Sequence, residues 1–377
     1  MCPQCTADAR FIEYRTRTIL TVCGSAELTR AYYHCSSCGA GHSPADDTLR
    51  LDGRYSPGVQ PLVALAGVLE PFRRAEELLD QLAGLRVSKE ACRVFTERAG
   101  ERLEAQHLTH PCVEPVRAPK PWDFTLPERD GQRFEGTVAY VGLDAFAVPT
   151  IGADGTREWK MLNVGLLYDP HKEHTIYLSG FDPKGVAEQL RAYAIAFDVG
   201  RAERVVALTD GGAGLESALS RHFGARVTFV LDFWHASEHL HEMARVWHGE
   251  GPVAARWAEH AVGVMRASGG AGLLDWFATH GPPAESLDAV REAWRVLLGY
   301  VNGNVHRMDY PTYRGRGWDI GSGPTEAGCK IVGSRLRGAG MKWWKPQSAH
   351  VAGLRALLLS NEGLWEGFWS GPRPQAA

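Results

Sequence analysis

Two stretches near the start of the chain, 11–22 and 27–34, have the residue pattern of β-strands and flank a Cys-Gly-Ser turn. From Ser56 onward the pattern becomes helical, with Pro57 at a first-turn position. Apolar residues then recur at helical spacing at Val59, Leu62, Val63, Ala66 and Leu69. Further helices are predicted at 72–82 and after Ser88. We therefore expect a small β-rich segment, 1–55, followed by a helical region, 56–110.

The three predicted helices at 56–110 allow two interpretations. They can form a helix-turn-helix that binds DNA, with 88–99 as the recognition helix. Three-helix packing without any DNA contact explains the same pattern equally well, and the sequence leaves both open.

Five prolines between 111 and 127 predict a linker, which we extend over 111–136. Beyond it the pattern is that of strands, at 137–151, 159–168 and 174–181. Helix and strand then alternate, with helices at 183–197 and 215–222 and strands at 204–209 and 226–231, and one continuous helix is predicted over 232–304. Three strands in hairpin order followed by alternating helix and strand predict a mixed α/β sheet.

Composition adds that the chain is of the globular kind, since 44% of its 377 residues are hydrophobic and 23% are charged. No run approaches the roughly 18 apolar residues that span a membrane, and the start has no signal-peptide pattern. We expect a cytoplasmic protein without a membrane partner. The eight cysteines are then expected to be thiols or metal ligands rather than disulfides.

The net charge of −3 conceals a basic segment near the carboxyl end. Between Val301 and Arg355 there are nine Lys or Arg against three Asp or Glu, which gives +6. Such a cluster would hold phosphates electrostatically, although an ordinary solvated basic face has the same composition.

Cys2-Pro-Gln-Cys5 and Cys35-Ser-Ser-Cys38 are two Cys-x-x-Cys pairs joined by the predicted hairpin. Each pair can direct two thiolates at one ion, and together they complete a tetrahedral Cys₄ shell, as in a zinc ribbon. A thioredoxin-like redox pair would need a βαβ setting, which 1–55 lacks. We predict a structural Zn²⁺ site.

Three acidic residues stand where a second metal site could be built. Asp144 lies within the first long strand, Asp210 ends another strand, and Glu326 opens a helix that Ser322 or Thr325 could cap. A single acid of this kind is usually a strand-end carboxylate facing water. Apolar or small residues flank Asp144 on both sides, however, and a buried carboxylate needs a cation or hydrogen-bond donors.

Together the three acids fit phosphodiester cleavage. That reaction requires an activated water or 3′-hydroxyl and a stabilised leaving oxygen, which two divalent ions roughly 4 Å apart provide. Carboxylate oxygens are the natural ligands of Mg²⁺ or Mn²⁺. Lys330 follows Glu326 by one helical turn, and further cations that could position phosphates are Arg335, Arg337 and Lys342. Trp343 and Trp344 could stack on an unpaired base or simply pack in the core.

The stretch 320–344 resembles the final block of insertion-sequence transposases of the Kra group. The stretch 231–240, with Asp232 and His235 in an Asp-x-x-His pattern, resembles that family's second block. The stretch Tyr140-Val-Gly-Leu-Asp-Ala145 resembles the first, and the cysteine pairs with Arg30-Ala-Tyr-Tyr-His-Cys35 fit its amino terminus. The similarity covers most of the chain in the family's order.

The resemblance implies a ribonuclease-H-like catalytic domain, 137–235 and 305–365, which is split by a helical insertion, 236–304. Carried over by position, the catalytic acids of this DDE-type transposase are Asp144, Asp210 and Glu326. His235 would support them by contacting the scissile phosphate or orienting a carboxylate. The implied partners are transposon ends and target DNA, bound by a homo-oligomer associated with the nucleoid.

Two other functions remain open at this point. A catalytically inactive, transposase-derived DNA-binding protein would bind element ends without cutting them. His235-Ala-Ser-Glu238-His239 is also a His-x-x-Glu-His pattern, typical of an inverted zinc metalloprotease. A protease would leave the cysteine pairs, the three acids and the basic segment unexplained.

Overall fold

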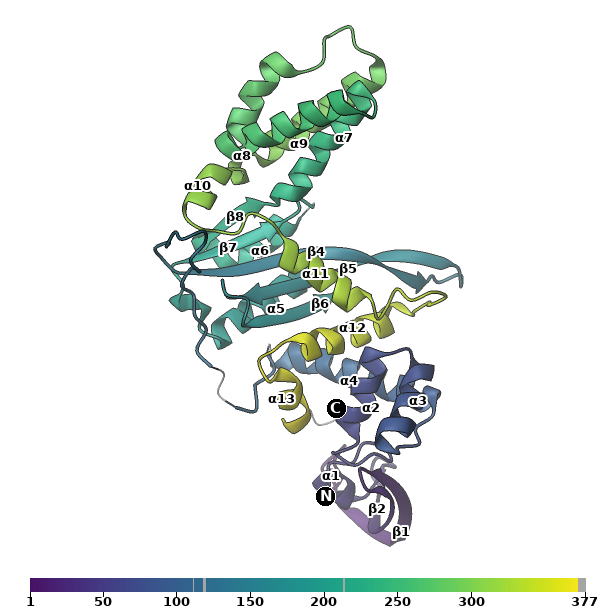
Figure 1. Ribbon diagram of the computed structural model, residues 1–377. Coiled ribbons are helices and arrows are strands. Elements are labelled where there is room, and N and C mark those ends of the chain that lie inside the picture. The colour runs from purple at the N-terminus through teal and green to yellow at the C-terminus, as the bar shows by residue number, and fades with distance from the viewer. Residues whose placement is uncertain (111, 118–119, 213, 372–377) are drawn as a thin grey trace. The chain divides into compact units, whose positions relative to one another are not determined.

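The computed structural model describes residues 1–377 except 111, 118–119, 213 and 372–377 (Figure 1). The chain forms two compact units. The first consists of the described residues of Met1–Ala118, Val148–Trp159 and Val332–Ala377, and the second of those of Pro119–Ala147 and Lys160–Ile331. No helix in these described parts is both long and apolar enough to cross a membrane.

The first unit begins with an antiparallel hairpin, as the sequence predicts. Strand β1 (Ala9–Thr21) pairs with β2 (Gly24–Cys35), and the register aligns Ala9 with Cys35. The turn ends at Gly24, whose φ of 109° favours glycine. A short strand, β3 (Gly41–His42), and helix α1 (Pro44–Thr48) complete this segment. Because the hairpin folds back on itself, its far end returns Cys35 to the start of the chain.

Three helices follow in the predicted region: α2 (Gln60–Leu69), α3 (Phe72–Ala83) and α4 (Lys89–Thr109). Helix α2 begins four residues after the predicted cap Ser56, so Pro57 lies before its first turn. The predicted cap of α4 is confirmed, since the Ser88 hydroxyl accepts a hydrogen bond from the Ala91 N–H at 3.3 Å. Helix α4 packs against α12 (Lys345–Leu359) so closely that a Cβ at Gly100 would collide with the His350 carbonyl. The helix-turn-helix interpretation remains a prediction.

The carboxyl-terminal helices α12 and α13 (Leu364–Ser370) belong to this first unit. The sequence prediction had assigned 305–365 to the domain of the central sheet, so the two divisions differ. The reason is that α12 buries Val351 and Leu354 among α4 and α2, and a helical period alone does not show which partner a helix covers.

The second unit contains a mixed five-stranded sheet, which confirms the predicted mixed α/β class. The strand order is β6-β5-β4-β7-β8. Strands β5 and β6 are antiparallel, whereas β7 is parallel to both β4 and β8. The strands are β4 (Val138–Ile151), β5 (Arg157–Tyr168), β6 (Thr175–Gly180), β7 (Arg204–Thr209) and β8 (Val227–Leu231).

Helices cover both faces of this sheet. On one face, a Cβ at Gly165 would lie 2.7 Å from Val186 of α5 (Pro183–Ala196). On the other, a Cβ at Gly328 of α11 (Gly323–Gly333) would lie 2.8 Å from Leu166. Since neighbouring residues 165 and 166 point to opposite sides of β5, α5 and α11 lie on opposite faces. Helix α6 (Leu215–Phe223) contacts α5, β7 and β8.

Part of the predicted linker 111–136 is packed core of the second unit. Trp122, Phe124 and Leu126 are all buried. The Trp122 ring stacks on His174, with centroids 5.5 Å apart. Pro111, Ala118 and Pro119 of the predicted linker lie outside the described residues. The described residues of 111–136 form no helix or strand, but several of them are buried, which the proline count did not predict.

The prediction of one continuous helix over 232–304 is wrong. The segment forms three helices, α7 (Phe233–His248), α8 (Pro252–His280) and α9 (Asp288–Asn304), which lie side by side (Figure 1). The first break falls at Gly249 and Gly251, whose φ angles are 73° and 140°. Helix α8 itself is kinked at Gly269, whose φ of 68° is not helical. The next break falls at Gly281-Pro282-Pro283, where two prolines remove backbone donors. Short elements connect the bundle to α11: η3 (Val305–Arg307) and α10 (Tyr310–Gly315).

Candidate functional site

Four cysteines converge at the amino end of the first unit. The Sγ atoms of Cys2 and Cys38 lie 3.6 Å apart, and those of Cys5 and Cys35 lie 3.5 Å apart. A tetrahedral zinc with Zn–S bonds of about 2.3 Å requires sulfur atoms about 3.8 Å apart. In the described part of the chain, this is the one set of three or more His, Cys, Asp or Glu whose ligand atoms all lie within 4.8 Å of one another. The cluster fits a structural zinc ion.

Backbone N–H groups prepare these sulfurs for a cation. The pKa of the Cys35 thiol is lowered to about 6, chiefly because the Cys38 backbone N–H hydrogen-bonds to its sulfur, with a further contribution from Ser37. The pKa of Cys2 is lowered in the same way by the N–H groups of Cys5 and Gln4. Each Cys-x-x-Cys turn therefore supplies one sulfur that readily forms the thiolate that a metal requires.

Two of the three predicted acids meet at the end of a parallel strand pair. Strands β4 and β7 are in register up to Gly142 opposite Leu208. Asp144 and Asp210 each lie two residues beyond this last pair, and the negative charge of Asp210 is close enough to raise the pKa of Asp144. Residues two apart point to the same face of a strand, so Asp144 lies on the same face as Gly142.

Glu326 reaches that face from α11. A Cβ at Gly142 would collide with the hydroxyl of Thr325, the residue before Glu326. Glycine at 142 thus lets the first turn of α11 lie directly on β4. The structure brings together Asp144, Asp210 and Glu326, which the sequence spreads over 183 positions.

The pKa of Asp144 also indicates that the three acids lie near one another. Its pKa is raised, first by burial and then by the negative charges of Asp210 and Glu326, while the backbone N–H of Ala145 opposes the rise. This N–H donates to Asp144 Oδ1 at 2.6 Å, and the buried Cys329 side chain also hydrogen-bonds to the carboxyl group. A carboxylate held beside two others without a cation is under repulsion that a divalent ion would relieve.

The three acids are more widely spaced than the cysteines. Among described residues they do not form a set with all ligand atoms within 4.8 Å. The three acids therefore do not form the compact ligand set of a single ion that the four cysteines form.

Asp232, of the Asp-x-x-His pattern, is a fully buried helix cap. Its Oδ1 accepts the backbone N–H groups of Trp234 at 2.6 Å and His235 at 3.0 Å. Its Oδ2 accepts the Ser322 N–H at 2.7 Å and the Ser322 hydroxyl. With four donors its oxygens are satisfied, and its role is to tie the start of α7 to the segment that leads into Glu326.

His235 lies half-buried on α7, one turn before His239. Their rings are 5.0 Å apart, and His235 Nδ1 lies 3.6 Å from Glu238. His239 in turn packs on Tyr300 at 4.1 Å, and burial lowers its pKa. These three side chains are not among the described residues whose ligand atoms converge within 4.8 Å, so the geometry gives the metalloprotease interpretation no support.

The sequence analysis missed Arg307, which is buried beneath the strand end that carries Asp210. Its Nη1 donates to the Thr209 hydroxyl at 2.9 Å and lies 3.5 Å from Glu216. Its Nε donates to Asn304 Oδ1 at 2.9 Å. Arg307 thus fixes the residue before Asp210 against the end of the helical bundle. In the sequence Arg307 is one of nine basic residues between Val301 and Arg355, and nothing in the pattern distinguishes it from the others.

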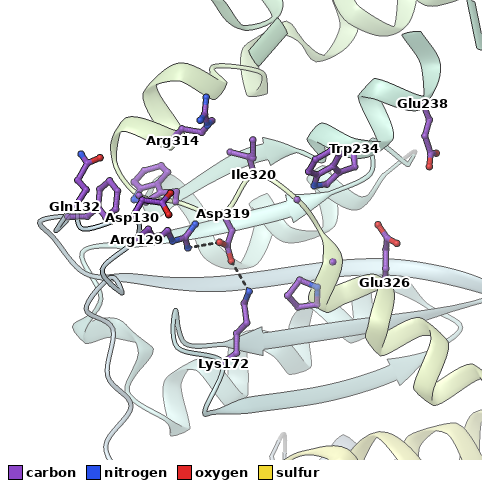
Figure 2. A pocket seen from close by; sticks show the side chains of 16 residues that line it. Arg129, Asp130, Gln132, Lys172, Trp234, Glu238, Arg314, Asp319, Ile320 and Glu326 are labelled. Atoms are coloured by element: carbon purple, nitrogen blue, oxygen red, sulfur yellow. Dashed lines mark hydrogen bonds and ion pairs between the residues drawn. The ribbon is translucent and has the colours of Figure 1, made fainter. Parts of the chain in front are cut away.

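An open cavity of about 790 Å³ adjoins Glu326 (Figure 2). Trp234 of α7 and Glu326 of α11 lie together at one end of it. At the other end Asp319 is paired with Arg129 at 2.7 Å and Lys172 at 3.5 Å. The sequence analysis named neither Trp234 nor these ion pairs.

The four predicted DNA-contacting cations differ in their surroundings. Lys330 is exposed and lies 3.8 Å from Glu326, and Arg337 and Lys342 are exposed. Arg335 is buried: its Nε donates to the Gly67 carbonyl at 2.8 Å. Its guanidinium also lies 4.6 Å from the Phe72 ring centroid and 5.2 Å from that of Trp343. These contacts assign Arg335 to the interior of the first unit.

Trp343 and Trp344, which follow the basic residues, also differ in their exposure to solvent. Trp343 is buried and its Nε1 donates to the Leu336 carbonyl at 3.0 Å, whereas Trp344 is 57% exposed. Core packing therefore accounts for Trp343.

No protein-family model and no curated protein matches this chain.

The cysteine cluster yields the first prediction. Cys35→Ser should abolish stoichiometric zinc in the purified protein and expose the amino-terminal hairpin to proteolysis, because metal binding supplies on the order of 10 kcal/mol to such a module. Zinc content and limited proteolysis measure this. Cys23→Ser, at an exposed cysteine outside the cluster, is the matched control. Full zinc content in Cys35→Ser would contradict the assignment.

The raised pKa of Asp144 predicts that, without divalent ions, the contribution of this residue to the stability of the fold falls as pH rises. Because its pKa is raised in the folded chain, its proton stabilises the fold at low pH, and that stabilisation is lost as pH rises through the raised pKa. Asp144→Asn should therefore melt above the wild type at neutral pH, with the difference shrinking as the solution is acidified. Asp154→Asn should act in the opposite direction, because hydrogen bonds from Thr156 lower the pKa of that exposed acid. Thermal melts at several pH values test both signs.

Arg335 and Arg337 are two residues apart, but the first is buried and the second is exposed, so their variants can be compared directly. Arg335→Ala should lower the free energy of unfolding by about 2 kcal/mol, because it removes a buried charged hydrogen bond. Arg337→Ala, at an exposed residue, should lower the free energy of unfolding by less, because exposed charged contacts contribute about 0–1 kcal/mol. Denaturant titrations distinguish the two. Equal stability of both variants would refute the structural role of Arg335.

Proposed function

We propose that the protein is a DDE-type transposase that binds the ends of its insertion sequence and catalyses DNA strand cleavage and strand transfer. One observation carries the proposal. Asp144 and Asp210, from neighbouring parallel strands, lie near the same end of the strand pair as Glu326, from the helix on that face, and Glu326 also lines an open cavity. The order β6-β5-β4-β7-β8, with β5 and β6 antiparallel, supports the ribonuclease-H-like core that the sequence resemblance implies.

The three carboxylates would hold two Mg²⁺ or Mn²⁺ ions. Bound there, the ions would activate the attacking water or 3′-hydroxyl and stabilise the leaving oxygen. The remaining contacts orient the ligands. The Ala145 N–H fixes Asp144, the Gly212 N–H donates to Asp210 Oδ1 at 2.8 Å, and the Ser322 hydroxyl lies 3.3 Å from Glu326 Oε1.

Surrounding residues complete the proposed DNA site. Lys330, next to Glu326, would neutralise a substrate phosphate. His235, half-buried on α7, would contact the scissile phosphate or orient a carboxylate. The Cys₄ cluster would hold a structural zinc ion, and the partners would be transposon ends and target DNA held by a homo-oligomer at the nucleoid.

A cleavage assay tests the proposal. Purified protein is incubated with a labelled duplex carrying its own element's ends and Mg²⁺ or Mn²⁺. Asp144→Asn, Asp210→Asn and Glu326→Gln should each lose cleavage by more than about 100-fold, the upper limit typical for losing an outer-shell partner, and should retain DNA affinity. Asp275→Asn, at an exposed acid on α8, should cleave like the wild type.

The other outcomes are informative. Cleavage that survives in all three variants would refute the triad. Binding of the ends by the wild type without metal-dependent cleavage would establish the inactive DNA-binding protein instead. Peptide hydrolysis lost on combined substitution of His235 and His239 would establish the protease.

A further inference from the structure

Trp234 is held in place yet left uncovered. Its side chain is 61% exposed, although it stands in the first turn of α7. Its backbone N–H is fixed by Asp232, and Phe233 packs edge-on against its ring at 5.4 Å. A Cβ at Gly321 would lie 2.8 Å from Trp234 Cδ1, so the indole rests on bare backbone. Because the ring is already positioned, less conformational entropy is lost when a ligand binds to it.

The exposed ring borders the cavity that Glu326 also lines (Figure 2). At about 790 Å³ the cavity is large enough for a small-molecule-sized group, since ligand sites span about 300–1,000 Å³. A group stacked on Trp234 would therefore lie at the end of the cavity that Glu326 lines.

The charges in the cavity favour a neutral, polar, flat group over a second phosphate. Of its cations, Arg129 and Lys172 are both paired with Asp319. Glu238 and Asp130 offer carboxylate acceptors, while Arg314 adds an exposed guanidinium. A nucleobase matches this set, because its face can stack on indole and its exocyclic amino groups can donate to carboxylates.

We propose that this cavity binds a single unpaired nucleotide of the DNA strand beside the scissile bond, with its base stacked on Trp234. The inference rests on the proposed transposase function and adds a substrate-binding site to it. Stacking at this position would draw the neighbouring phosphate toward Glu326 and separate the two strands at the cut.

Substitutions of Trp234, combined with changes in the DNA, test whether a base stacks on its ring. The probe is a duplex of the element's end nicked at the mapped cleavage position, with Ca²⁺ replacing Mg²⁺ so that binding is measured alone. Trp234→Ala should weaken binding roughly ten-fold, and Trp234→Phe, which retains an aromatic face, should recover most of it. Trp159→Ala, at a tryptophan that is 56% exposed and does not line the cavity, is the control.

An abasic residue is then moved through the positions flanking the nick. At one position it should weaken wild-type binding by a similar factor and cause no further loss in Trp234→Ala. Equal binding by wild type and Trp234→Ala, or losses that multiply at every position, would overturn the proposal.

The wild type's cleavage of the intact end in Mg²⁺ separates this proposal from the one on which it rests. If the wild type cleaves and Trp234→Ala binds normally, the nucleotide site alone is refuted. If the wild type neither binds nor cleaves the ends, both proposals fall together. Melting temperatures of the variants verify that each is folded.

Discussion

The candidate site depends on one constraint, the parallel pairing of β4 with β7 and the glycine at its last pair. Pairing up to Gly142 and Leu208 brings Asp144 and Asp210 to the same end of the strand pair, because register leaves little freedom of relative position along two hydrogen-bonded strands. Gly142 then admits α11 to within contact of the strand, where any side chain would meet Thr325. A substitution at Gly142 would displace Glu326 without touching an acidic residue. Backbone geometry therefore determines where the three carboxylates lie.

A second constraint brings the cavity to the same place. The buried carboxylate of Asp232 caps α7 and also binds Ser322, while the Phe233 N–H donates to the Ile320 carbonyl at 2.9 Å. These contacts join segments that the whole helical bundle separates in sequence. They hold Trp234 beside the segment that leads into Glu326. Arg307 makes the corresponding connection at Asp210, from the other end of the bundle.

The sequence predicted what depends on local pattern. The Cys-x-x-Cys pairs, the hairpin, the strands of the sheet and the cap at Ser88 all follow from residue type and spacing. The break at Gly249 and Gly251 was missed because the helical period resumes on either side of it.

What depends on tertiary partners was not predictable from the pattern. Burial of Arg335 and Arg307 cannot be read from charge, because a guanidinium in a basic run looks the same whether it faces water or a carbonyl. The packing of Trp122 inside a proline-rich stretch, and that of α12 on α4, likewise depend on surfaces distant in sequence. Trp234 was overlooked because an exposed tryptophan and a core tryptophan have identical local surroundings in the chain. The convergence of the three acids was proposed from the chemistry of phosphodiester cleavage and then from the resemblance, and the pairing of β4 with β7 supports it for the two aspartates.

The placement of the bundle between β8 and α11 also governs when the carboxylate site can exist during protein synthesis. Asp144 and Asp210 belong to strands that can pair early, but Glu326 is the 326th of 377 residues and follows the entire bundle. At elongation rates of about 5–20 residues per second, several seconds separate the emergence of Asp210 from that of Glu326. A nascent chain of this design cannot assemble the full carboxylate set until the whole bundle has been synthesised.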